Sequence, residues 1–323
     1  MKRLLCAVTS LVALAAIATG CGTSEKAEDK AATSGGPVSV TDSRGKKIDL
    51  KEPARRVVAL EWGEAEMLVT LGVMPVGVAD IKNFAIWDTA VKIDAGVKDV
   101  GTRSEPSIDA IVALKPDLIV MEVEKDFALV EQLEKFVPVL VAKGSDATRN
   151  LERMREDFTM IATAVGKTTE AKKTLTELDG ALAAAKTKIA AAGGANKPFV
   201  MADGWKEGST ISIRMFGQGS YVSQLAIQAG LKNAWTGKVD EAWGLGNTDV
   251  EGLSPLKDQD VRFLYSAPED DVFAQGLAGN AIWDSMTFAR NKQVHKLPNG
   301  IWTFGGPASS RQFIDQLVKV YAG

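Results

Sequence analysis

Short apolar runs alternate with helical patterns between residues 38 and 142. Two alternating runs, 38–42 and 47–50, flank a Ser43-Arg44-Gly45 turn and predict a small hairpin. Further apolar runs predict strands, at 57–60, 75–79, 118–121 and 139–142. Apolar residues at helical spacing predict helices, at 64–71, 108–114 and 127–136. Strands that alternate with helices are typical of a doubly wound α/β layer.

Residues 147–192 break this alternation. Apolar positions recur there at steps of three and four, at Leu151, Met154, Phe158, Ile161 and Val165. The helical pattern resumes further along and stops at the glycine pair 193–194. It predicts a helix of about 25 residues, near 37 Å long at 1.5 Å per residue. Such a helix is long enough to cross the back of two lobes.

The second half of the chain repeats the first. Strands are predicted at 199–202, 211–215, 261–266 and 294–297, and helices at 221–229 and 314–321. Residues 108–115 match 250–257 at a constant offset of 142, and 67–73 match 225–231 at an offset of 158. We therefore expect an α/β protein with two doubly wound lobes bridged by a single long helix. The cleft between such lobes is the default ligand site.

These patterns divide the chain into an N-terminal lobe at 37–146, a helical segment at 147–194 and a C-terminal lobe at 195–323. The residues before them form a targeting segment. Lys2 and Arg3 precede an apolar run that ends at Cys21, which indicates a signal peptide over 1–20 and a flexible polar tether over 21–36.

The small residues before Cys21 are similar to the bacterial lipobox, in which that cysteine receives a diacylglyceryl group. We expect an exported protein, anchored by lipid to the outer face of the cell membrane. An ordinary secretory signal with an incidental cysteine is the alternative. Cys6 lies within the signal, so no disulfide is expected in the exported domain.

Composition narrows the functional classes. The 41 acidic and 38 basic residues give a net charge of −3, which disfavours nucleic acid as a partner. One histidine and two cysteines cannot furnish a zinc site. No paired acids, hydrolase signature or kinase signature indicates catalysis. We expect a protein that is not an enzyme and has no metal or intrinsic cofactor.

Aromatic residues are the more suggestive candidates. Trp62, Trp87 and Trp302 fall in predicted loops after strands, and Trp243 lies in a glycine-rich loop. They are candidate ligand contacts, or lids over the ends of the sheets. Arg103, in a loop between a strand and a helix, is either a further contact, a solvated charge or part of a local ion pair. Trp235 and Trp283, which lie among apolar neighbours, are expected in the core.

Four segments together resemble one family: RVVALEW at 56–62, LGVMPVGVAD at 71–80, GTRSEP at 101–106 and LKPD at 114–117. The likeness continues at 233–235, 243–244, 282–283 and 302–305, so it covers essentially the whole mature chain. The sequence resembles the iron-siderophore substrate-binding proteins of ABC importers, of the ferric-hydroxamate and ferric-citrate type. The resemblance implies the helical-backbone fold of class III periplasmic binding proteins, with a shallow cleft and small hinge motion.

The resemblance also implies a ligand and its contacts. Arg103 and Trp243 match positions that contact the iron chelate in hydroxamate binders. The full set of candidate contacts comprises Arg103, Trp243, Trp62, Trp87, Trp302, Arg214, Phe127 and Tyr221. The cleft tyrosine of the hydroxamate binders has no match in 121–127, where Phe127 can replace it only in shape. A ferric siderophore of the hydroxamate type is the expected ligand, with ferric citrate, heme or a corrinoid as alternatives and a surface enzyme as a weaker one.

The expected partner is a two-fold ABC permease with its ATPase. Asp109 and Glu251 hold equivalent positions in the two repeats, and related importers dock one acid per lobe onto the permease. Each carboxylate could instead favour only its own helix N-terminus. We expect the protein itself to be a monomer.

Overall fold

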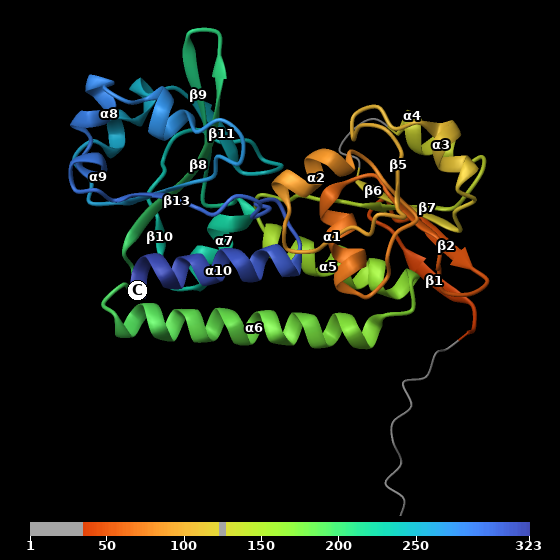
Figure 1. Ribbon diagram of the computed structural model, residues 1–323. Coiled ribbons are helices and arrows are strands. Elements are labelled where there is room, and N and C mark those ends of the chain that lie inside the picture. Colours follow the sequence, from red (N-terminus) through yellow and green to blue (C-terminus); the bar gives the residue numbers. More distant parts are fainter. Residues whose placement is uncertain (1–34, 123–126) are drawn as a thin grey trace, which may run out of the picture. The chain divides into compact units, whose positions relative to one another are not determined.

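The computed structural model describes residues 35–122 and 127–323 (Figure 1). An antiparallel hairpin opens this part of the chain, with β1 at Val38–Thr41 and β2 at Lys47–Leu50. A five-stranded parallel sheet follows, in the order β5-β4-β3-β6-β7. Its strands are β3 (Val57–Ala59), β4 (Gly77–Val78), β5 (Lys98–Asp99), β6 (Leu118–Glu122) and β7 (Val139–Ala142). β3 and β7 are buried throughout, which is why they read as unbroken apolar runs.

Four helices belong to this first lobe. They are α1 (Trp62–Thr70), α2 (Ile81–Trp87), α3 (Ile108–Ala113) and α4 (Ala128–Leu133). The sequence pattern predicted α1, α3 and α4 but missed α2 and β5. β5 has only two residues, both exposed, and α2 has a single buried residue, Phe84, so neither carries an apolar periodicity.

Two helices lead from the first lobe to the second. α5 spans Asn150–Ala164, and α6 spans Thr168–Ala191 over 24 residues, close to the predicted length. The buried residues of α6 form one stripe: Ala171, Leu178, Ala181, Leu182, Ala185 and Ile189. α6 packs against α5 and the C-terminal helix α10 (Pro307–Ala322), below both sheets in Figure 1.

The second lobe has a mixed sheet, in the order β11-β9-β8-β12-β13 with β10 also paired to β8. Its strands are β8 (Pro198–Glu207), β9 (Thr210–Phe216), β10 (Lys232–Asn233), β11 (Leu245–Thr248), β12 (Arg262–Tyr265) and β13 (Val294–Lys296). The parallel part, β10-β8-β12-β13, has the same order as β4-β3-β6-β7 in the first lobe. The sheets thus confirm the internal repeat.

The second lobe departs from a simple doubly wound unit at β9 and β11. Both strands are antiparallel to their neighbours and extend the sheet beside β8. β11 occupies part of the segment that the sequence pattern assigned to a glycine-rich loop. The remaining helical segments are α7 (Tyr221–Gln228), η1 (Glu251–Leu256), η2 (Val272–Gly276), α8 (Ala281–Ser285) and α9 (Thr287–Arg290).

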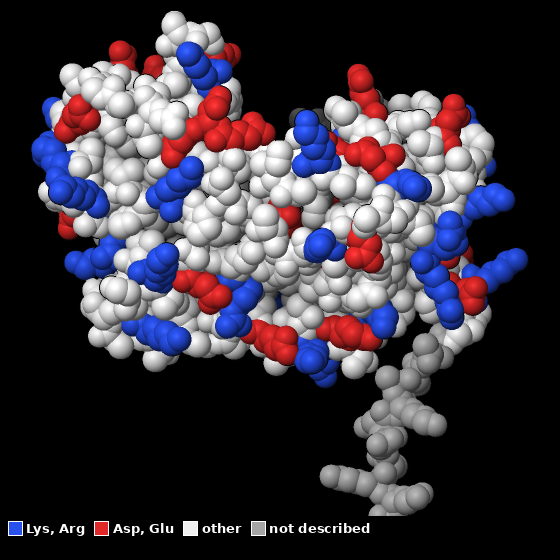
Figure 2. Space-filling view, in the orientation of Figure 1, with Lys and Arg blue, Asp and Glu red and all other residues white. Residues whose placement is uncertain are grey.

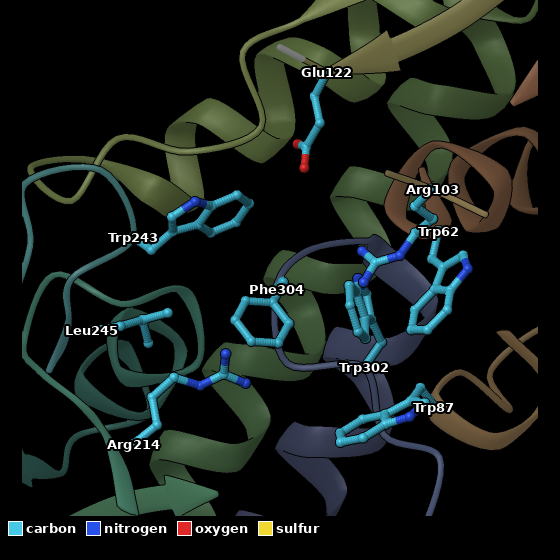
Figure 3. A pocket seen from close by; sticks show the side chains of 9 residues that line it. All are labelled: Trp62, Trp87, Arg103, Glu122, Arg214, Trp243, Leu245, Trp302 and Phe304. Carbon is cyan, nitrogen blue, oxygen red and sulfur yellow. The ribbon is translucent and has the colours of Figure 1, made fainter. Parts of the chain in front are cut away.

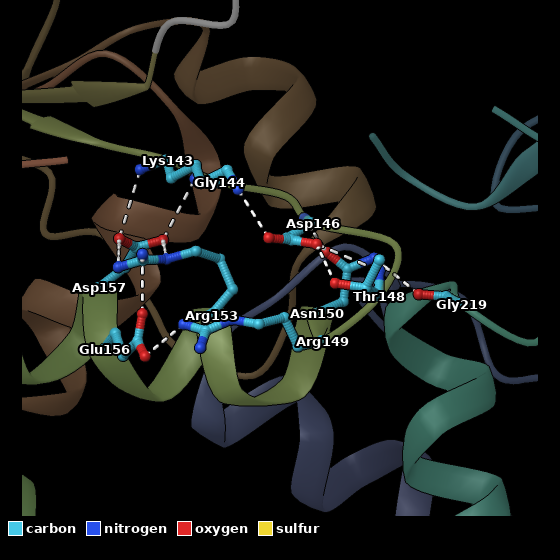
Figure 4. A network of polar contacts seen from close by, with 10 residues as sticks. All are labelled: Lys143, Gly144, Asp146, Thr148, Arg149, Asn150, Arg153, Glu156, Asp157 and Gly219. Atoms are coloured by element: carbon cyan, nitrogen blue, oxygen red, sulfur yellow. Dashed lines mark hydrogen bonds and ion pairs between the residues drawn. The ribbon is translucent and has the colours of Figure 1, made fainter. Parts of the chain in front are cut away.

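Polar contacts tie the lobes together where β7 leads into α5 (Figure 4). Asn150 Nδ2 donates to the carbonyl oxygen of Gly219 at 2.8 Å, and the N–H of Ala147 donates to the carbonyl oxygen of Glu241 at 3.2 Å. The buried Asp157 carboxylate accepts from the N–H groups of 143 and 144 and from the Arg153 guanidinium. These contacts join the crossing segment to α5 and to the second lobe.

Basic and acidic side chains are interspersed over the face shown in Figure 2, in keeping with the near balance of charges. In residues 35–122 and 127–323, no helix is long and apolar enough to span a bilayer. The predicted signal peptide, Cys21 and all but the end of the tether lie outside the described residues.

Candidate ligand-binding cleft

A cavity of about 380 Å³ lies between the two lobes and is here named the cleft. Nine residues line it: Trp62, Trp87, Arg103, Glu122, Arg214, Trp243, Leu245, Trp302 and Phe304 (Figure 3). The first four come from the N-terminal lobe and the next three from the β9–β11 region of the second lobe. The last two lie on the loop that precedes α10. The cleft therefore exists only when both lobes and this loop are in place.

Aromatic rings form a continuous floor across the cleft. Trp62 and Trp302 meet edge to face with ring centroids 5.2 Å apart, and Trp302 contacts Phe304 at 4.8 Å. Phe304 in turn meets Trp243 edge to face at 5.7 Å. The Trp62 indole is fixed further by a hydrogen bond from Nε1 to the carbonyl oxygen of Ala79 at 3.2 Å. Such a floor offers a rigid, largely apolar surface to a ligand.

Arg103 lies on this floor at one end. Its guanidinium carbon is 4.0 Å from the Trp62 ring centroid, within cation–π range. Its Nη1 donates to Glu61 Oε2 at 2.8 Å. A guanidinium has five N–H donors, so Arg103 keeps donors for a ligand while Glu61 fixes its position.

Arg214 occupies the opposite end, on β9. It forms a two-point ion pair with Asp203 of β8, from Nε at 2.9 Å and from Nη2 at 2.5 Å. Its guanidinium carbon is 5.0 Å from the Phe304 ring centroid. Burial raises the pKa of Asp203 and the Arg214 pair opposes that rise. Each arginine of the cleft thus has its own carboxylate partner.

Acidic side chains gather around a smaller cavity of about 30 Å³ that shares Glu122, Trp243, Trp302 and Phe304 with the cleft. They are Glu61, Glu64, Glu122 and Asp157. Burial, followed by the charges of Glu61 and Asp157, raises the pKa of Glu64 to about 8. Burial also holds the pKa of Glu122 well above its ordinary value, with Glu64 as the next cause. Burial and the neighbouring carboxylates therefore favour the neutral forms of Glu64 and Glu122.

Six of the eight predicted ligand contacts line the cleft: Trp62, Trp87, Arg103, Arg214, Trp243 and Trp302. Trp62 and Trp87 are not loop residues, however. Trp62 begins α1, which follows the end of β3, and Trp87 is the last residue of α2, which follows β4.

The structure does not bring the other two candidates to the cleft. Tyr221 is 3% exposed in the core, its hydroxyl pairs with Ser310 Oγ, and it does not line the cleft. Phe127 is exposed at the start of α4, and it does not line the cleft. Trp235 and Trp283 lie in the core as predicted.

Three cleft residues escaped the sequence analysis: Glu122, Leu245 and Phe304. Glu122 ends β6, directly beside the end of β3 that leads to Trp62. The rule that ligands bind at the carboxyl ends of parallel strands would have found it. Phe304 could have been found from its place two residues after Trp302, in the same loop.

Asp109 and Glu251 are both exposed in the first turns of equivalent segments, α3 and η1. Ser107, at the N-cap of α3, accepts a hydrogen bond from the N–H of Ala110, so α3 has a cap without Asp109. Among the described residues, no group of three or more histidine, cysteine, aspartate or glutamate side chains could hold a metal ion.

The sequence and the fold of this chain are similar to those of known proteins. A sequence profile described as periplasmic binding protein matches residues 57–300. The chain belongs to the periplasmic binding protein family. Members of this family bind solutes for transport, and this periplasmic binding protein is accordingly a binding protein and not an enzyme.

Relatives span nearly the whole chain. YhfQ of Bacillus subtilis, named provisionally as an ABC transporter substrate-binding lipoprotein, is 31% identical and covers 99% of this chain and 98% of its own. The iron(3+)-hydroxamate-binding protein FhuD of Escherichia coli is 27% identical over 83% of this chain and 87% of its own. The Fe(3+)-citrate-binding protein YfmC of Bacillus subtilis is 29% identical over 98% of this chain and 97% of its own.

A solved structure confirms the fold. The siderophore-binding protein FhuD of Vibrio cholerae, determined with Fe³⁺-Desferal, superposes with a TM-score of 0.70 at 23% identity, covering 83% of this chain and 98% of the other. The expected helical-backbone architecture, with α6 as the bridging helix, is therefore correct.

Proposed function

We propose that this periplasmic binding protein captures a ferric siderophore of the hydroxamate type in the cleft and delivers it to an ABC permease. The observation that carries the proposal is the cleft itself, an aromatic floor with an arginine at each end. Two relatives are named for binding iron(3+)-hydroxamate and Fe(3+)-citrate, and these names support a ferric chelate as the ligand.

A ferric chelate fits the chemistry of these side chains. Its iron is already saturated by oxygen ligands, so the protein need not supply metal ligands. Burying about 100 Å² of a tryptophan against the chelate contributes roughly 2.5 kcal/mol. A hydrogen bond from an arginine to a chelate oxygen contributes about 1.5 to 3 kcal/mol. Neither contribution dominates, so floor and arginines act together.

Charge favours hydroxamate over citrate. Arg103 is paired with Glu61 and Arg214 with Asp203, so neither arginine adds an uncompensated positive charge. Three hydroxamates carry three negative charges and balance Fe³⁺, whereas ferric citrate and ferric catecholate complexes are anionic. A cleft without surplus positive charge suits the neutral chelate.

Tryptophan fluorescence tests the proposal. The purified protein is titrated with ferric trihydroxamates, ferric citrate and a ferric tris-catecholate, and each iron-free chelator serves as the control. We expect saturable quenching by ferric trihydroxamate, because the chelate lies against Trp243 and Trp302. Preferential quenching by an anionic chelate would overturn the hydroxamate assignment, and no quenching by any ferric chelate would overturn the siderophore function.

We further propose that the protein is held at the outer face of the membrane through a lipid on Cys21. The name of the relative YhfQ supports such an anchor. Cys21→Ala should move the protein from the detergent phase to the aqueous phase in phase partitioning, while chelate binding stays unchanged. A mutant as strongly membrane-associated as wild type would refute the anchor.

The permease is proposed to contact one exposed acid on each lobe, Asp109 and Glu251. Their equivalent places in the two repeats support this pairing with a two-fold partner. Because Ser107 already caps the N-terminus of α3, the helix does not need Asp109 as a cap.

A further inference from the structure

Glu122 differs from the other charged residues of the cleft. It enters from the end of β6 and its carboxylate points into the cavity, across from the aromatic floor and between Trp243 and Arg103 (Figure 3). In the part of the chain that the structure describes, this carboxylate forms no hydrogen bond and no ion pair. Both arginines of the cleft are already paired with other acids.

The surroundings of Glu122 carry a surplus of acidic groups. Glu64, Glu61 and Asp157 all oppose its ionisation, and only Arg103 favours it. An anionic ligand group placed against Glu122 would add to this repulsion. A cationic group would relieve it, because an opposite charge at hydrogen-bond distance favours the ionised carboxylate.

The position of Glu122 also limits which part of a ligand it can meet. A chelate that lies on the floor presents its iron-bound oxygens to the arginines at the two ends. Glu122 faces it from the other side of the cavity, where the organic periphery of the chelate would lie. A donor group on that periphery is the natural partner of a carboxylate, which accepts hydrogen bonds when ionised.

We propose that Glu122 determines specificity by accepting a hydrogen bond from a protonated amine on the periphery of the ferric chelate. This inference rests on the proposed siderophore function and narrows it to chelates with a neutral ferric core and a cationic side group. The paired arginines bind the core, and Glu122 selects the substituent.

A matched pair of ligands tests this role. One is a linear ferric trihydroxamate with a free primary amine, and the other is the same chelate with that amine acetylated, so that a neutral amide replaces the positive charge. Affinities are measured by tryptophan quenching for wild type, Glu122→Gln and the control Glu131→Gln, which replaces an exposed glutamate of α4 in the same lobe. Circular dichroism verifies that each variant is folded.

We expect wild type and the Glu131 variant to bind the amine chelate about tenfold or more tightly than the acetylated one, the range of a charge-assisted hydrogen bond. Glu122→Gln should bind both chelates equally, at the wild-type affinity for the acetylated one. Equal binding of the two chelates by wild type, or equal weakening of both by Glu122→Gln, would overturn the inference. In either case the siderophore function would stand, whereas absence of quenching by both chelates would refute the hydroxamate assignment on which this inference rests.

Discussion

The contact between Glu66 and the start of α10 lends itself to a quantitative prediction. Glu66 lies on α1, fully buried, and its Oε1 accepts from the N–H groups of Ala308 at 2.7 Å and Ser309 at 3.0 Å. Its Oε2 accepts from Ser309 Oγ at 2.6 Å. The first-lobe helix thereby caps the C-terminal helix, and the loop with Trp302 and Phe304 lies directly before this cap. The contact positions the aromatic floor as well as the helix.

Glycine at 306 is required for this arrangement. Its φ of 102° is unfavourable for other residues, and a Cβ there would lie 2.0 Å from Glu66 Oε2. Burial, followed by the charge of Asp88, holds the pKa of Glu66 well above its ordinary value. The side chain is therefore favoured in its neutral form, which a glutamine imitates.

Glu66→Ala would leave the N–H groups of Ala308 and Ser309 without an acceptor. The Ser309 hydroxyl keeps an alternative partner, the carbonyl oxygen of Gly305 at 3.0 Å. At about 1 to 3 kcal/mol for each buried unpaired group, the free energy of unfolding should fall by about 2 to 6 kcal/mol. Glu66→Gln retains an oxygen for both N–H groups and should lose less than about 1 kcal/mol.

Urea unfolding of the three proteins, followed by circular dichroism, measures these differences. Chelate titration of the folded Glu66→Ala protein should also show weaker quenching, because the loop before α10 loses its support. A Glu66→Ala protein within about 1 kcal/mol of wild type would refute the capping role. Equal losses for the alanine and glutamine variants would refute the argument from the hydrogen bonds.

The remaining predictions concern the cleft, the buried acids and the docking surface. Arg103→Ala and Trp243→Ala should each weaken chelate binding by about 1.5 to 3 kcal/mol in fluorescence titrations, and unchanged affinity in both would place the site elsewhere. The pKa of Glu64 is raised to about 8, so its contribution to stability is complete below pH 4.5 and is lost as pH rises through 8. In urea titrations Glu64→Gln should therefore flatten the fall in the free energy of unfolding over that interval, roughly 1 kcal/mol for each pH unit, and a profile parallel to wild type would contradict the raised pKa. The double variant Asp109→Ala, Glu251→Ala should lose uptake of ferric chelate while its affinity and melting temperature stay near wild type, since exposed ion pairs contribute only about 0 to 1 kcal/mol each. Normal uptake would leave these acids without a docking role.

The sequence by itself determined the elements whose pattern is local. The length of the long helix α6 was predicted to within a residue or two, because its apolar stripe repeats at helical spacing over 24 residues. The strands β2 and β7 were predicted with their observed bounds. The internal repeat predicted two similar lobes, and through the strand-end rule it placed a ligand between them.

Only the tertiary structure decided how charges and rings are partnered. The pairing of Arg103 with Glu61 joins residues 42 positions apart, and the contact of Glu66 with Ser309 joins residues 243 positions apart. No periodicity encodes such contacts, because they depend on the order of strands and on where the last loop crosses the cleft. For the same reason Tyr221 belongs to the core, although it was among the candidate ligand contacts. That Glu122 has no hydrogen-bond or ion-pair partner among the described residues likewise became visible only in the fold, because the pairing of a side chain depends on which distant residues the fold brings beside it.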